Sequence, residues 1–190
     1  ARLILTTPEP FTLTGLPDCP DEAEEPDPFL TVLRTVREMV FRFLESPALP
    51  LAERLRRLTG LGWTLQHHLA DPAGLAALCR ETLAKPAALS PLTESTPSAF
   101  LSPSASPEEE AELSRIGVYL IYRYFLPLAL DGDLCSPLCF PEAALRLIRG
   151  LWQCGGAVQP TERQRIAQLF SKEIEYSEEN REEFCQAALS

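Results

Sequence analysis

One arginine lies inside an apolar stretch of the chain, and its chemistry needs an explanation. The segment 112–130 reads ELSRIGVYLIYRYFLPLAL, and the neighbours of Arg123 in it are Tyr119, Leu120, Ile121, Tyr124 and Phe125. A guanidinium buried among such side chains costs several kcal/mol when it has no partner. We therefore expect Arg123 to pair with a carboxylate, with backbone carbonyls or with groups of a binding partner.

Residue types that perform catalysis form no recognisable pattern in this sequence. It contains no glycine-rich nucleotide loop, no metal-binding helix motif and no serine nucleophile elbow. The two histidines, His67 and His68, are adjacent, so on a helix they point about 100° apart and do not face one site. Acid-rich runs such as 108–110 and 178–183 are typical of helix caps and solvated faces. We assign no catalytic residue and no cofactor.

The six cysteines are scattered without the spacing of a disulfide framework. In a chain of this size they indicate free thiols and an intracellular, cytoplasmic protein. Cys135 and Cys139 could form half of a zinc site, but no second close pair accompanies them. We assign no metal site.

Composition and charge restrict the classes of partner. The chain has 190 residues, of which 45% are hydrophobic, as expected for one globular unit. Its net charge of −10 argues against a nucleic acid or an anionic lipid surface as the main ligand, because both require clustered basic residues. No run reaches the roughly 18 to 20 apolar residues of a membrane span, and no signal sequence is evident.

The first 28 residues and residues 86–107 differ in composition from the rest. We expect residues 1–28 to form an irregular acidic arm with a short β-prone piece at Leu3–Thr7, because prolines and like charges oppose regular structure. Residues 86–107 contain five prolines among Ser, Thr and Ala, which predicts a mobile Pro/Ser-rich loop. Residues 29–190 otherwise form the expected helical domain.

Apolar residues recur every three or four positions through this domain, and no long alternating pattern competes, so the predicted class is all-α. A helix from Pro28 ends at Ser46-Pro47, a second runs from Leu51 to about Ala70, and a third covers residues 73–84. Gly60 and Gly62 favour a bend or break near Leu61.

The second half of the domain repeats this pattern. A helix begins at a Ser106 cap, is ended or kinked at Pro127, and is followed by a turn at Asp131-Gly132-Asp133. Two further helices are expected over 141–152 and 160–174, and a last one over 177–189. The side chains expected to point inward from the first two are Leu145, Ile148, Leu151, Ile166, Leu169 and Phe170.

The run around Arg123 resembles the signature helix of Ras GTPase-activating (RasGAP) domains. That signature reads F-L-R-F-x-N-P-A, and residues 121–128 read IYRYFLPL, so its arginine is matched by Arg123. Upstream, residues 50–54 (PLAER) resemble the family's I-P-x-x-x-R run. Downstream, residues 145–153 (LRLIRGLWQ) resemble its L-x-L-I-x-K-x-L-Q helix. The closest branch is that of the IQ-motif-containing scaffolds, and the resemblance covers residues 30–189.

The resemblance implies a multi-helix RasGAP-like bundle that binds a small GTPase of the Ras or Rho type, or another protein. The implied binding residues are Tyr122, Arg123, Leu126, Pro127 and Arg54. In the family the signature arginine steadies a separate finger loop and does not touch the phosphate. Arg123 alone would therefore not replace that finger.

Two departures from the family bear on activity. The family's Asn and Ala are Leu126 and Leu128 here, which removes a polar group that helps to organise the GTPase-facing loop. No arginine-finger loop is recognisable before Arg34, where the only arginine is Arg2. An inserted arginine contributes about 10³ to 10⁵ in rate, so we expect GTPase binding or scaffolding without efficient activation.

Two alternatives remain open at the level of sequence. The chain could be an active GTPase-activating domain whose finger lies upstream of Ala1. It could also be a helical adaptor unrelated to GTPases, with Arg123 as a paired core arginine and with residues 86–107 and the acidic arm as docking elements.

Overall fold

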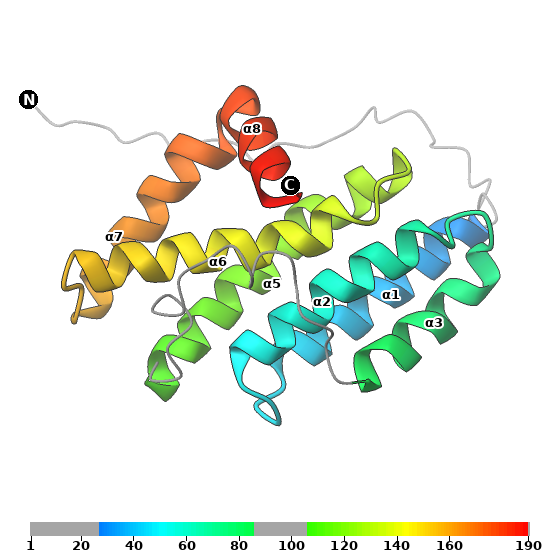
Figure 1. Ribbon diagram of the computed structural model, residues 1–190, viewed down its shortest axis with the longest axis horizontal. Coiled ribbons are helices and arrows are strands. Elements are labelled where there is room, and N and C mark those ends of the chain that lie inside the picture. Colours follow the sequence, from blue (N-terminus) through cyan, green and yellow to red (C-terminus); the bar gives the residue numbers. More distant parts are fainter. Residues whose placement is uncertain (1–26, 86–105, 190) are drawn as a thin grey trace, which may run out of the picture.

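The computed structural model describes residues 27–85 and 106–189, and every regular element in these ranges is helical (Figure 1). The elements are α1 (Pro28–Glu45), α2 (Leu51–Gln66), α3 (Pro72–Ala84), α5 (Pro107–Leu130), α6 (Ser136–Cys154), α7 (Pro160–Phe170), the π-helical turn η2 (Ser171–Glu175) and α8 (Glu178–Leu189). The predicted all-α class is confirmed.

Local capping residues fix the starts of two central helices. At α1 the side chain of Asp27 accepts a hydrogen bond from the backbone N–H of Phe29 at 2.9 Å. At α5 Ser106 and Glu109 each accept from the other's backbone N–H at 3.2 Å. These bonds satisfy amides that have no partner inside the helix. The predicted starts at Pro28 and at the Ser106 cap are confirmed.

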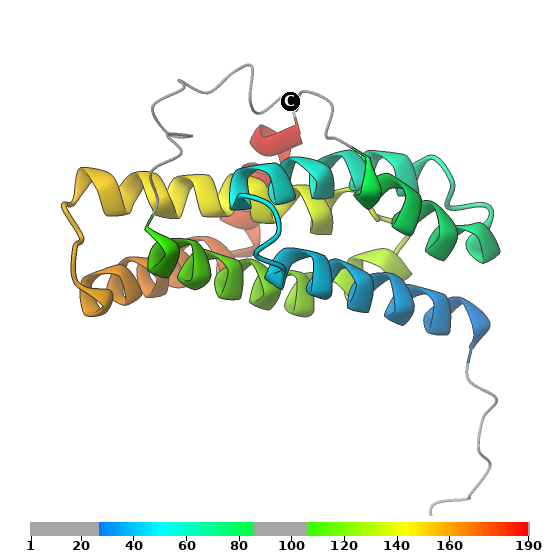
Figure 2. The same ribbon diagram turned by 90° about the horizontal axis from the view of Figure 1, so that it is seen from below.

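The helices form two layers around one core. In Figure 2, α1, α5 and α7 lie in one layer and α2 and α6 in the other, while α3 packs against both α1 and α2 at one end. Each central helix directs a stripe of fully buried side chains between the layers. These include Leu33, Val40 and Leu44 of α1, Leu58, Leu61 and Leu65 of α2, Leu120, Ile121 and Phe125 of α5, and Ile148 of α6.

Helix α2 runs unbroken past both of its glycines. A break near Leu61 does not occur, and the helix ends at Gln66 rather than at Ala70, with a turn over residues 67–70. Gly62 lies where α2 and α6 approach closely, because an added Cβ would be 3.0 Å from the carbonyl oxygen of Cys135 and 3.2 Å from the Leu138 Cβ. The leucine stripe buried along α2 outweighs the weak helix propensity of glycine, about 1 kcal/mol per residue.

Two prolines lie inside helices, so Pro127 does not end its helix and Pro141 does not begin one. Helix α5 continues through Pro127 to Leu130, and α6 begins at Ser136 and contains Pro141, which we had expected to start it. Each proline removes a helix hydrogen bond. Buried side chains flank both positions, Phe125 and Ala129 around one and Phe140 and Ala144 around the other, and their burial holds the helical path.

Most residues predicted to point inward from α6 and α7 are buried or partly buried, but two are not. Leu151 is 43% exposed and Leu169 is 49% exposed, so both predictions are wrong. On α6 the next residue, Trp152, is buried instead, and its indole N–H donates to the carbonyl of Arg163 at 3.1 Å. The buried face of α6 therefore continues from Leu145 and Ile148 to Trp152 rather than to Leu151.

The acidic arm and the Pro/Ser-rich loop lie almost wholly outside the described residues, as do the β-prone piece and Cys19. The last residues of each segment are described and form the start of a helix, because Asp27 caps α1 and Ser106 caps α5.

Candidate functional site

Helix α5 presents a row of polar aromatic and basic side chains to solvent. Tyr119, Tyr122 and Arg123 are spaced three and four residues apart and therefore lie on one face of the helix. Tyr119 is 42% exposed and Tyr122 is 63% exposed. Together with Arg37 of α1 and Tyr176, which follows η2, these residues form what we call the Tyr–Arg surface.

Arg123 is held at the edge of the core and is not buried within it. Its side chain remains 33% exposed. The reason is the helix register, because Leu120, Ile121 and Phe125 occupy the core-facing side of α5. A carboxylate partner, one of the three kinds that we expected, is present.

That carboxylate belongs to Glu175, whose side chain is only 3% exposed and lies 3.7 Å from the Arg123 Nη1. Arg123 also donates a hydrogen bond to the hydroxyl oxygen of Tyr119 at 2.6 Å. This bond raises the pKa of Arg123. The guanidinium carbon lies 5.5 Å from the ring centroid of Tyr124 and 5.1 Å from that of Tyr176, within cation–π range.

Glu175 in turn fixes a second side chain of α5. The hydroxyl of Tyr124 donates to the Glu175 Oε2 at 3.1 Å. Burial, with the charge of Glu175 as the next contribution, raises the pKa of Tyr124 to about 12. Glu175 is the last residue of η2, and π-helical turns are frequent at functional sites. The turn places one buried carboxylate against two neighbouring residues of α5.

Arg37 extends the surface onto α1. Its guanidinium carbon lies 5.5 Å from the ring centroids of both Phe41 and Tyr122. The Arg37 side chain is 17% exposed, and its buried Nε has no hydrogen-bond partner among the described residues. The two aromatic rings therefore orient this cation.

Four of the five predicted binding residues lie close together along α5. Tyr122 and Pro127 are exposed, Arg123 is partly exposed, and Leu126 is partly buried against the core. They occupy less than two turns of one helix. The fifth residue, Arg54, does not join them.

Arg54 is a buried structural cation of α2. Only 4% of it is exposed, and its Nη1 donates to the carbonyl of Leu44 and to the Ser114 hydroxyl, the latter at 3.1 Å. Glu110 lies 3.7 Å away. Burial lowers the pKa of Arg54, and the charge of Glu110 acts in the opposite direction.

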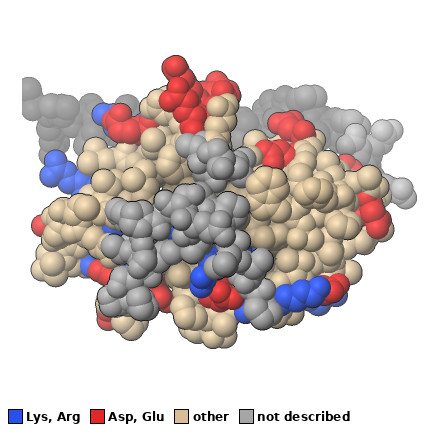
Figure 3. Space-filling model, viewed as in Figure 1, with Lys and Arg blue, Asp and Glu red and all other residues tan. Residues whose placement is uncertain are grey.

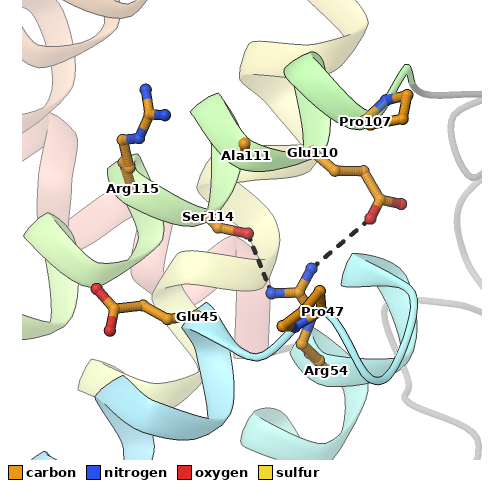
Figure 4. Close-up of a pocket in the computed structure, with 8 residues that line it drawn as sticks. All are labelled: Glu45, Pro47, Arg54, Pro107, Glu110, Ala111, Ser114 and Arg115. Atoms are coloured by element: carbon orange, nitrogen blue, oxygen red, sulfur yellow. Dashed lines mark hydrogen bonds and ion pairs between the residues drawn. The ribbon is translucent and has the colours of Figure 1, made fainter.

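Figure 4 shows Arg54 at a cavity of about 600 Å³ between the α1–α2 connection and the first turns of α5. Ser114, which Arg54 contacts, is nine residues before Arg123. Nine residues turn a helix by about 180° and advance it by about 13 Å. Ser114, with the Arg54 that contacts it, and Arg123 therefore lie on opposite sides of α5.

The stretches of α1 and α5 that carry Arg37 and Arg123 are basic, although the chain as a whole is acidic. Residues 34–42 of α1 and 115–123 of α5 carry five arginines and one glutamate, whereas the whole chain has a net charge of −10. Acidic side chains gather instead over α8, at the top of the face shown in Figure 3. That helix exposes Glu178, Glu179, Glu182 and Glu183.

The residues considered for metal binding do not assemble a ligand set. The Sγ atoms of Cys135 and Cys139 lie 3.6 Å apart and are buried, and the five described cysteines are free thiols. His67 and His68 are exposed, and each ring bonds a backbone carbonyl four residues earlier. Within residues 27–85 and 106–189, no group of three or more His, Cys, Asp or Glu is placed to hold a metal ion.

Comparisons of the chain with protein-family models, with curated proteins and with solved structures return no match. None of the helices in the described ranges is both long and apolar enough to cross a membrane.

Sequence reasoning did not identify three important residues of this site. Arg37, Glu175 and Tyr176 were not singled out, although Arg37 and Phe41 are spaced four apart on α1 and so share a face. Glu175 and Tyr176 belong to a polar segment whose contact with α5 depends on the tertiary fold, and no local pattern marks it.

Proposed function

We propose that this chain is a protein-docking module that binds a small GTPase of the Ras or Rho type through the Tyr–Arg surface, without efficiently accelerating GTP hydrolysis. The observation that carries the proposal is the row Tyr119, Tyr122 and Arg123, exposed on the same helix whose sequence resembles the RasGAP signature.

The composition of the surface supports a protein partner. Tyrosine and arginine are enriched among the residues that contribute most to protein–protein binding. Here they are ordered before any partner arrives, because Tyr119 and Glu175 hold Arg123, and Phe41 and Tyr122 hold Arg37. Preorganisation lowers the entropy lost on binding.

The charge of the surface supports a partner with acidic groups. The arginine-rich stretches of α1 and α5 form a local basic region on a strongly acidic chain. Complementary charge increases the association rate and disfavours partners whose basic surfaces would meet like charge. A GTPase face that combines carboxylates with apolar side chains would match both properties.

The environment of Arg123 supports binding without efficient activation. An arginine finger must insert into the nucleotide site to stabilise the transferring phosphoryl group. Arg123 lies in the middle of a 24-residue helix and is engaged by Tyr119 and Glu175. Insertion would break these contacts.

Binding and hydrolysis assays with Ras- and Rho-type GTPases test the proposal. Each GTPase is loaded with a non-hydrolysable GTP analogue for the binding assay and with GTP for the hydrolysis assay. We expect saturable binding to at least one GTPase and little acceleration of hydrolysis. Absence of binding across the panel would overturn the proposal and favour a helical adaptor unrelated to GTPases.

Strong acceleration of hydrolysis would overturn the second half of the proposal. It would favour an active domain, and repeating the assay with a chain extended upstream of Ala1 would show whether further segments contribute the finger.

A further inference from the structure

Tyr176 has the most accessible phenol of the chain. It is 74% exposed, compared with 63% for Tyr122, 42% for Tyr119 and 9% for Tyr124. It also lies at the joint between η2, which ends at Glu175, and α8, which begins at Glu178. The three other tyrosines lie within the continuous helix α5.

This position suits an enzyme that must grip the backbone around a tyrosine. A protein kinase binds its substrate segment in an extended form, which a residue inside a long helix cannot adopt without unwinding. The non-helical joint at residues 176–177 requires less rearrangement. Exposed glutamates flank it on both sides, Glu173 before and Glu178 and Glu179 after.

The phenol also lies next to a cation of the Tyr–Arg surface. The guanidinium carbon of Arg123 is 5.1 Å from the ring centroid of Tyr176. A phosphate on the phenol adds nearly two negative charges and three acceptor oxygens within reach of that guanidinium. Arginine binds phosphate through strong, charge-assisted hydrogen bonds.

We propose that Tyr176 is a phosphorylation site for a tyrosine kinase that prefers acidic flanking residues, and that the phosphate binds Arg123 and closes the Tyr–Arg surface. The γ-phosphoryl group of ATP is transferred to the phenol oxygen, the phenol proton is released, and ADP leaves. The closing of the surface to a GTPase rests on the function proposed above, whereas the modification and the contact with Arg123 do not.

The first experiment maps the modification on the full chain. The protein is incubated with ATP and an acid-directed tyrosine kinase, and the modified residue is identified by mass spectrometry. We expect phosphate on Tyr176, loss of incorporation in Tyr176→Phe and normal incorporation in Tyr122→Phe. Equal incorporation in Tyr176→Phe, or no incorporation at Tyr176 in the unaltered chain, would overturn the proposal.

The second experiment tests the contact with Arg123 without any partner. Phenylglyoxal modifies accessible guanidinium groups, and mass spectrometry gives the rate at each arginine. We expect phosphorylation to slow the modification of Arg123 and to leave that of Arg115, an exposed arginine two turns earlier on α5, unchanged. An unchanged rate at Arg123 would overturn the second half of the proposal.

A binding measurement separates failure of this inference from failure of the proposed function. If a GTPase binds the unmodified chain, phosphorylation should weaken that binding by about tenfold or more, because like charges then face the acidic partner. If the phosphorylated chain binds the GTPase as tightly as the unmodified chain does, the claim that phosphorylation closes the Tyr–Arg surface is wrong. If neither form binds, the proposed function fails, while the two experiments above still decide the modification and its contact.

Discussion

Glu175 is the buried charge on which the Tyr–Arg surface depends. Its carboxylate lies 3.7 Å from Arg123 and accepts a hydrogen bond from Tyr124 at 3.1 Å, while only 3% of its side chain is exposed. A buried carboxylate without partners would be unfavourable, so the two residues of α5 and the turn η2 stabilise one another. This arrangement links the exposed cation to the core.

Replacing Glu175 by glutamine should therefore destabilise the fold. The substitution keeps the volume and an acceptor but removes the charge that faces Arg123. Because Arg123 is one-third exposed, we expect a loss of about 1 kcal/mol in the free energy of unfolding, measured by urea denaturation. Glu178→Gln, at an 81% exposed side chain, is the control and should change it by less than about 0.5 kcal/mol. Equal effects of the two substitutions would contradict the role of Glu175.

The phenol of Tyr124 should make stability fall at high pH. Its pKa is raised to about 12 in the folded chain, whereas an unfolded tyrosine titrates near about pH 10. Below about pH 10 both states keep the proton and the stability is complete. Between about pH 10 and 12 only the unfolded chain loses the proton, so the free energy of unfolding should fall, by about 2 kcal/mol from this group.

Tyr124→Phe provides the comparison for this titration. The variant should lose the Tyr124 contribution to the decline while keeping that of the remaining groups. Denaturation curves measured at a series of pH values from neutral to alkaline give the slope for each protein. Identical slopes for Tyr124→Phe and the unaltered chain would show that this phenol does not titrate as described.

At the residue scale, the sequence predicted that Arg123 needs a partner but did not predict which residue that partner is. An arginine among apolar residues predicted a partner, and a carboxylate is present. The register of the helix, which places Leu120, Ile121 and Phe125 inward, leaves Arg123 at the rim. The partner Glu175 could not be located, because η2 meets α5 only through the tertiary fold.

Two glycines on α2 should respond in opposite ways to the same substitution. A Cβ at Gly60 meets no atom within 4 Å, so Gly60→Ala should stabilise the helix by about 0.5–1 kcal/mol. A Cβ at Gly62 would lie 3.0 Å from the backbone oxygen of Cys135, the residue before α6, so Gly62→Ala should lower stability by about 1 kcal/mol or more. Thermal unfolding measures both, and a stabilising Gly62→Ala would contradict the close approach of α2 and α6.

At the element scale, local sequence signals were sufficient to predict most helices. They were insufficient where the packing of the core opposes them. The Ser106 cap and the three-and-four spacing of apolar residues are local signals, and they predicted the starts of α5 and α1. Pro127 and Pro141 gave a local signal to end or begin a helix, but burial of their neighbours kept both helices continuous. Propensity is a weak guide when the core decides.

At the scale of the whole molecule, charge is unevenly distributed. The outer stretches of α1 and α5 carry five arginines and one glutamate, while exposed glutamates concentrate on α8. The net charge alone argued only against nucleic acids and anionic lipid surfaces as the main ligand. The local basic region emerges when the fold brings α1 beside α5, and this contact lies between segments far apart in the sequence.

Binding to an acidic partner should therefore depend on salt. We expect the affinity to fall by about tenfold between about 0.05 and 0.5 M sodium chloride. Added salt shortens the Debye length and so screens the attraction between exposed charges. Arg37→Gln should weaken binding and reduce this dependence, whereas Arg165→Gln, an exposed arginine on α7, should do neither. Fluorescence titrations at several salt concentrations provide the measurement. A salt-independent affinity would contradict an electrostatic contribution from α1 and α5.

The most direct measurement of the central claim is a calorimetric titration of an analogue-loaded Ras- or Rho-type GTPase into three folded proteins. These are the unaltered chain, Tyr122→Ala and Trp63→Ala, the last removing a 40% exposed aromatic on α2 in the other layer. Tyr122→Ala should weaken binding by about 30-fold, the effect of losing a residue central to an interface, and Trp63→Ala should leave it unchanged. Equal affinities for all three proteins, or no binding to any GTPase tested, would contradict the assignment of the Tyr–Arg surface.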